Sequence, residues 1–154
     1  MADLVIDEWL WSDLAAENTV ERQRQAFQFL QAVFIKCDRI VIVKGSKFES
    51  KANALWKHTD VTRRYIARFY KDRFLYNSDK SQLLEESQLQ NLPAPLASEV
   101  NVDDQYLVQA LIAANASSII TTDNPLIDIL ARHGLSSEHR DTFVSTYISR
   151  YWQG

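Results

Sequence analysis

The sequence predicts an α/β fold, a three-layer α/β/α sandwich around a central, mainly parallel sheet. Short runs of β-branched and apolar residues occur along the chain, as expected for strands that are buried on both faces. Longer segments with apolar residues at helical spacing separate these runs. Strands that alternate with helices are typical of a parallel sheet covered by helices on both sides.

Length and composition predict a single domain spanning residues 1–154. The chain has 154 residues, of which 46% are hydrophobic, which is enough for one core and too little for two. The formal net charge of -3 does not by itself predict nucleic-acid binding. The single cysteine, Cys37, is interpreted as a buried apolar residue in a reducing compartment. We find no signal-peptide pattern and no apolar run of membrane-spanning length, so we expect a cytoplasmic protein without membrane contact.

The individual elements follow from the same patterns. We expect strands at 4–6, 39–44, 117–122 and, with a weaker pattern, 134–139. Helices are expected at 18–36, from about 47 to 75, from 103 to 114 and from 123 to 133, and a loop at 91–98. The last helix has Asp123 as its N-cap, Pro125 in its first turn and Gly134 at its end.

Acidic residues recur where the predicted strands end and helices begin. Asp7 follows the first strand, Glu49 lies after the second, and Asp123 closes the third, whereas Asp103 and Asp104 open the helix before it. Open parallel sheets bind ligands outside the carboxyl ends of their strands. The sequence therefore predicts that these acids share one edge of the sheet.

Each acid taken singly has a capping explanation. Ser46 and Glu49 fit a capping box, Asn101 or Asp103 could cap one helix, and Asp123 could cap the next. Asp7 differs, because it is followed by Trp-Leu-Trp and by the like-charged Glu8, where a lone ionised group is costly. Several converging carboxylates would repel one another without a cation, and magnesium or manganese accepts such oxygen ligands. The joint pattern favours a metal site.

These residues resemble a known family. The stretch 102–123, with "DDQYLV", Ala110 and "IITTD", resembles the C-terminal motif of PIN-domain nucleases, and "LVIDEWLW" resembles their opening strand. The resemblance covers both ends of the chain and residues 39–51, but not about 52 to 98. It implies a ribonuclease dependent on Mg²⁺ or Mn²⁺. Glu8 and Trp9 depart from the family pattern, which has a small polar residue and then Asn after the first aspartate.

The resemblance also implies roles for individual residues. Asp7, Asp103 or Asp104, and Asp123 would hold the metal. Glu49 would complete the acidic cluster, and Thr121 would lie near the metal or the phosphate.

A basic segment offers a place for RNA. Residues 44–80 contain ten basic and four acidic residues, a net charge of +6. On a helical wheel, one narrow stripe is formed by Lys57, Arg64, Arg68 and Lys71. Such a stripe suits a phosphate backbone, and it equally suits an ordinary solvated helix face.

Other functions remain open at this stage. A non-catalytic PIN-like module that binds RNA or protein is the main alternative, and the Glu8-Trp9 departure is its support. A phosphatase with an aspartyl nucleophile would need a second aspartate at position 9, where this chain has Trp. The family includes toxins of toxin–antitoxin pairs, so an antitoxin protein is one partner that the resemblance allows. A second copy of the chain, forming a homodimer, is another.

Overall fold

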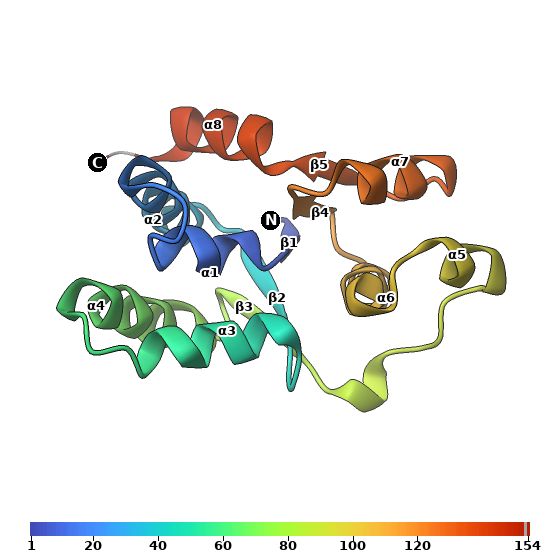
Figure 1. Cartoon of the computed structure of the whole chain (residues 1–154), viewed down its shortest axis with the longest axis horizontal. Coiled ribbons are helices and arrows are strands. Elements are labelled where there is room, and N and C mark those ends of the chain that lie inside the picture. Colours follow the sequence, from blue (N-terminus) through green and yellow to red (C-terminus); the bar gives the residue numbers. More distant parts are fainter. Residues whose placement is uncertain (153) are drawn as a thin grey trace.

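The computed structural model of the protein, which describes residues 1–152 and 154, contains one five-stranded, all-parallel sheet (Figure 1). The strand order is β3-β2-β1-β4-β5. The strands are β1 (Asp3–Ile6), β2 (Arg39–Val43), β3 (Ser81–Leu84), β4 (Ser118–Thr121) and β5 (Ser137–His139). The α/β sandwich expected from the sequence is therefore confirmed.

Strand β1 lies at the centre of the sheet and pairs with β2 on one side and β4 on the other. Leu4 is level with Ile40 of β2 and with Ser118 of β4. The chain adds strands first on the β2 side and then on the β4 side, so the strand order reverses between β1 and β4. In doubly wound sheets this reversal leaves a crevice at the carboxyl ends of the two strands, where ligands bind.

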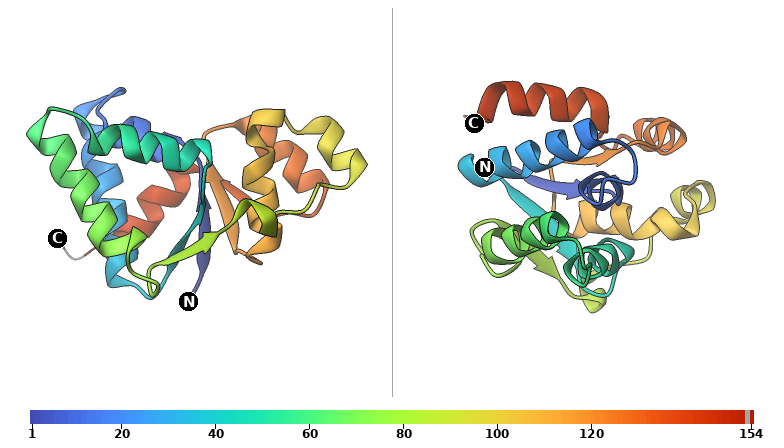
Figure 2. Two further views of the ribbon diagram at one scale, coloured as in Figure 1. Left: turned by 90° about the horizontal axis from the view of Figure 1, so that it is seen from below. Right: turned by 60° about the vertical axis from the view of Figure 1, so that its left-hand side comes forward.

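Helices cover both faces of the sheet (Figure 2). Leu4, Ile6 and Ile42 face one apolar core, which contains residues of α1 (Trp9–Leu14), α2 (Val20–Ile35), α3 (Lys47–Trp56), α4 (Val61–Tyr70) and α8 (Arg140–Tyr151). Val5 and Val41 face the second core, which is built with α5 (Ala94–Glu99), α6 (Gln105–Ala113) and α7 (Asn124–Arg132). Alternate strand residues thus serve opposite layers.

The structure corrects the long helix expected from 47 to 75. Helix α3 ends at Trp56, and Asp60 then caps a new helix, because its side chain accepts a hydrogen bond from the Arg63 amide at 2.9 Å. Helix α4 continues into a π-helical turn, Lys71–Leu75. A wheel drawn through 57–71 as one helix was therefore wrong.

Five further features differ from expectation. Strand β3 is formed by a segment in which no strand was expected, and α5 occupies most of the expected loop at 91–98. The chain enters α6 through a 3-10 turn, Val102–Asp104, with Asn101 accepting a hydrogen bond from the Asp103 amide. A second 3-10 turn, Glu86–Gln88, follows β3. Cys37 is exposed rather than buried. Among the described residues, no helix is both long enough and apolar enough to cross a bilayer.

Candidate functional site

The carboxyl ends of β1 and β4 are joined by one buried hydroxyl. Thr121, with no exposed surface, donates a hydrogen bond to Asp7 Oδ2 at 2.7 Å, and its Oγ1 accepts one from the Asp123 amide at 3.1 Å. The Asp7 amide donates to the carbonyl of Ile120 at 3.0 Å. Asp7 and Asp123 therefore lie at the same edge of the sheet, at the point where the strand order reverses.

Helix α1 is fixed against this edge by Trp9, one of the two residues that depart from the family pattern. The buried Trp9 indole N–H donates to the Ile120 carbonyl at 2.8 Å. Glu8 occupies the N-cap position of α1, and its amide donates to Asp7 Oδ1 at 2.6 Å. The anchored helix start holds the Glu8 backbone directly beside Asp7.

Glu8 belongs to the acidic site, although the sequence analysis left it outside. Burial and then the Asp7 carboxylate raise the pKa of Glu8, while Lys51 and Lys47 oppose the shift. The position of Glu8 next to Asp7 at a strand end is the sequence signal for this role. Sequence alone presents Glu8 only as a like-charged neighbour of Asp7.

The structure distinguishes Asp104 from Asp103. Burial, followed by Asp7, Asp123 and Glu8, raises the pKa of Asp104 to about 6, so this carboxyl lies in the field of the other three. The Asp103 side chain is 67% exposed and pairs with Lys47, Nζ to Oδ2 at 3.1 Å. Of the two aspartates expected as alternatives, Asp104 is the one that joins the cluster.

Glu49 lies apart from this group. Its Oε1 accepts a hydrogen bond from the Gly45 amide at 3.3 Å, and its own amide donates to Ser46 Oγ at 3.4 Å. It lines a separate hollow together with Lys57, a hollow whose lining includes none of the other acids. Half of the expected capping box is present, because Ser46 caps α3, but the Glu49 carboxylate accepts from the Gly45 amide and not from the Ser46 amide, which donates to the Val43 carbonyl at 3.3 Å.

We tested whether Asp7, Glu8, Asp104 and Asp123, hereafter the acidic cluster, suit a divalent cation. All four offer hard carboxylate oxygens, which suit Mg²⁺ or Mn²⁺. Within residues 1–152 and 154, however, no three acidic, His or Cys side chains are already arranged as metal ligands. Asp123 Oδ1 accepts from the Leu126 amide at 3.1 Å, which leaves its second oxygen free. The donor chemistry suits such a cation, but the side chains as they lie do not form a coordination shell.

Tyr106 lies in the field of the same acids. Its hydroxyl is buried and has no hydrogen-bond partner among the described residues. Burial, then Glu8, Asp7 and Asp104, raise the pKa of this phenol, while the nearby Phe48 backbone amide opposes the shift. A buried hydroxyl without a partner beside a carboxylate cluster is a donor available to a ligand or to a water held there.

A hollow of about 510 Å³ lies beside Asp7 and Glu8, two members of the acidic cluster. It is lined by Asp7, Glu8, Trp9, Ser12, Asn18, Arg22, Lys51 and Thr122. Arg22 is already paired with Asp13 at 3.2 Å and with Asp141 at 3.4 Å. Lys51 therefore brings to this hollow the positive charge that an entering anion would meet.

The predicted basic stripe is divided by the break between α3 and α4. Arg64 and Arg68 line a hollow of about 520 Å³ with Trp56, Val61 and Tyr65. Lys71 Nζ lies 4.1 Å from the ring centroid of Trp56. Lys57 lines the hollow of Glu49 instead. The four residues do not form the single stripe that one continuous helix would have given.

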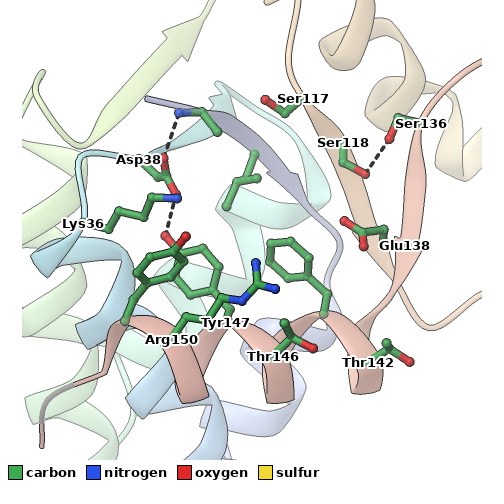
Figure 3. Close-up of a pocket in the computed structure, with 14 residues that line it drawn as sticks. Lys36, Asp38, Ser117, Ser118, Ser136, Glu138, Thr142, Thr146, Tyr147 and Arg150 are labelled. Carbon is green, nitrogen blue, oxygen red and sulfur yellow. Dashed lines mark hydrogen bonds and ion pairs between the residues drawn. The ribbon is translucent and has the colours of Figure 1, made fainter.

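The opposite edge of the sheet carries another hollow, of about 340 Å³ (Figure 3). The buried Asp38 accepts hydrogen bonds from the Ala2 amide at 2.8 Å and the Tyr147 hydroxyl at 2.6 Å, and it pairs with Lys36 at 3.5 Å. Its charge is compensated within the protein, and the contacts join the chain start, β2 and α8. We interpret this hollow as structural, because ligands of parallel sheets bind at the other edge.

The chain matches no model of a known protein family, no curated protein and no solved structure.

Proposed function

We propose that this protein is a metal-dependent ribonuclease of the PIN type, which hydrolyses phosphodiester bonds of RNA with Mg²⁺ or Mn²⁺. One observation carries the proposal. Carboxylates from β1, β4 and the start of α6 converge at the point where the strand order reverses, and Asp104 senses the charges of Asp7, Asp123 and Glu8. Such mutual repulsion costs stability, and a divalent cation relieves it.

The residues of the site would have different roles, which follow from their positions. Asp7, Glu8, Asp104 and Asp123 would hold the cation, which when bound polarises a phosphodiester and makes a bound water nucleophilic. Thr121 orients Asp7 through its hydroxyl and leaves further lone pairs of that carboxylate free. Lys51, in the lining of the hollow, attracts the phosphate chain, whereas Arg22 is held by Asp13 and Asp141.

Adjacent aspartates provide a matched test of the metal site. Asp104→Asn and Asp103→Asn remove the same charge one residue apart, but Asp104 lies in the field of three cluster acids, whereas Asp103 pairs with Lys47 and contributes least among the charges that shift the pKa of Glu8. In thermal melts, manganese at a hundredfold excess over its Kd should stabilise the wild type by about 2.7 kcal/mol. We expect Asp104→Asn to lose most of this gain and Asp103→Asn to keep it.

Activity is tested on single-stranded RNA with manganese. Asp7→Asn should abolish cleavage while leaving most of the RNA affinity. If the wild type neither cuts RNA nor gains stability from manganese, the nuclease proposal fails.

The alternative is a non-catalytic module of the same fold. It is favoured by the departure of Glu8 and Trp9 from the PIN-domain pattern. The lack of a ready set of three metal ligands in the described part of the chain favours it as well. RNA binding without manganese binding would establish it. A toxin role remains a corollary of the nuclease proposal, and a small antitoxin gene beside this one would support it.

A further inference from the structure

A second hollow lies between α1 and α3, next to the hollow at Asp7 and Glu8. The second hollow, of about 210 Å³, is lined by Trp11, Ser12, Ala15, Glu17, Lys51, Ala54, Leu55, His58 and Arg63. Ser12 and Lys51 line both hollows. Because the two hollows share these residues, we treat them as one furrow, which reaches from Asp7 and Glu8 to the start of α4.

Lys51 and Arg63 bring positive charge to this furrow, whose lining also includes the carboxylates of Asp7, Glu8 and Glu17. Lys51 stands where the hollows meet and lies near enough to Glu8 to lower its pKa. Arg63 stands at the far end, where its guanidinium donates to His58 Nε2 at 2.6 Å. Among the described residues, neither Lys51 nor Arg63 has a carboxylate within 4.0 Å, so both charges remain available to a partner.

One face of α3 produces this arrangement. Lys47, Lys51 and Ala54 follow at intervals of four and three residues, which places them on one side of the helix, and His58 lies just beyond the helix end at Trp56.

Part of the furrow wall is apolar. Ala15 and Ala54 offer surface for sugar and base faces, whereas Leu55 is only 4% exposed. Trp11 is only 2% exposed, and its indole N–H has no acceptor among the described residues. The Arg64–Arg68 hollow contains no residue of the acidic furrow, so a strand lying there would not be led to the acids by shared walls.

We propose that the furrow between α1 and α3 binds the single strand of RNA that leads into the acidic site, with Lys51 and Arg63 contacting separate phosphates. This inference rests on the proposed function, because it takes RNA as the substrate. Under this proposal, the RNA phosphates contact Lys51 of α3 and Arg63 of α4 instead of Arg64 and Arg68.

Two double variants with equal charge loss test the furrow. Binding of a fluorescein-labelled single-stranded RNA is measured by anisotropy in EDTA at several salt concentrations. Lys51→Ala with Arg63→Ala should weaken binding and reduce the log–log salt slope by about 1.4, or ~0.7 for each lost phosphate contact. Arg64→Ala with Arg68→Ala should leave the slope unchanged. Lys51→Arg with Arg63→Lys should retain it, since the charges stay, and far-ultraviolet circular dichroism checks that all variants are folded.

The outcomes separate this inference from the nuclease proposal. An unchanged slope in the furrow variant, or an equal loss in both double variants, overturns the furrow even if the wild type cleaves RNA. A wild type that binds no RNA overturns it as well. A selective loss in the furrow variant supports the furrow even if no cleavage is seen with manganese.

Discussion

At the scale of single residues, the site depends on which carboxylates lie close enough to shift one another's pKa. Asp103 and Asp104 are neighbours of the same type, yet one is exposed and paired with Lys47 and the other is half-buried among carboxylates. The difference follows from the 3-10 turn that opens α6, which sends consecutive side chains in different directions. Glu8 enters the cluster by the same kind of local geometry, through its place at the start of α1.

The raised pKa of Asp104 makes stability depend on pH. Its pKa is about 6 in the folded protein and 3.8 in the reference state, so the folded protein binds the proton more tightly. The ionised Asp104 therefore lowers the folding stability by its full amount above about pH 6, and this destabilisation decreases as the pH falls toward 4. Metal-free Asp104→Asn should be more stable than the wild type at pH 7.5, and the difference should shrink at pH 5.

Urea denaturation at both pH values, in EDTA, measures this difference. Asp103→Asn is the control, and we expect no pH-dependent gain from it. A metal-free Asp104→Asn protein that is less stable than the wild type at pH 7.5 would contradict the repulsion on which the metal proposal depends.

At the scale of elements, a helix cap and a proposed metal ligand coincide in one side chain. Asp123 closes β4 and caps α7, because its Oδ1 accepts from the Leu126 amide at 3.1 Å. The cap uses one oxygen and holds the other in place at the strand end. Capping and cation binding, which the sequence presented as alternatives, are therefore compatible at this residue.

Two substitutions of Asp123 separate its roles. Asp123→Asn keeps an oxygen that can cap α7 but removes the charge, so the metal-free protein should stay as stable or become more stable. Asp123→Ala removes the cap and should cost about 1 kcal/mol of unfolding free energy. Both should lose stabilisation by manganese in thermal melts. If Asp123→Asn destabilised the metal-free protein as much as Asp123→Ala, charge rather than the cap oxygen would hold α7.

At the scale of the whole molecule, the two edges of the sheet have different tasks. The edge at the carboxyl ends of β1 and β4 collects like charges, whereas the opposite edge neutralises Asp38 with the Ala2 amide, Lys36 and the Tyr147 hydroxyl. Asp38 and Tyr147 are 109 residues apart in the chain, so this hydrogen bond fastens α8 to the start of β2. We expect stability to be governed at one edge and binding at the other.

Tyr147→Phe tests this division. It removes the hydroxyl that donates to Asp38 and leaves the ring in its core, so it should cost about 1 to 3 kcal/mol of unfolding free energy. Manganese stabilisation and RNA affinity, measured below the unfolding transition, should stay at wild-type values. A change in either of them at full folding would show that the two edges are coupled.

The sequence by itself determined the features that depend on local pattern. Runs such as Leu4–Ile6 and Ile119–Ile120 are apolar and β-branched enough to define buried strands, and Asp123, Pro125 and Gly134 mark the ends of α7. Because parallel strands end at a common edge, the placement of Asp7 and Asp123 together also followed from the sequence. The sequence-based prediction was wrong for segments with weak or misleading patterns. Strand β3 has the mixed sequence Ser-Gln-Leu-Leu, and the break before Asp60 lies inside an otherwise helical pattern.

Only the tertiary structure decided which residues of this edge meet. The hydrogen bond from Thr121 to Asp7 joins residues that are 114 positions apart in the chain. Side-chain direction at helix starts decides that Asp104 rather than Asp103 lies among the other acids, that Glu8 joins them and that Glu49 does not. The furrow between α1 and α3 depends on where α4 begins, since Arg63 reaches it only after the chain has turned at Asp60. Sequence spacing gives the element on which a residue lies. The direction of its side chain and the neighbours it meets are fixed by packing between elements far apart in the chain, which local periodicity does not encode.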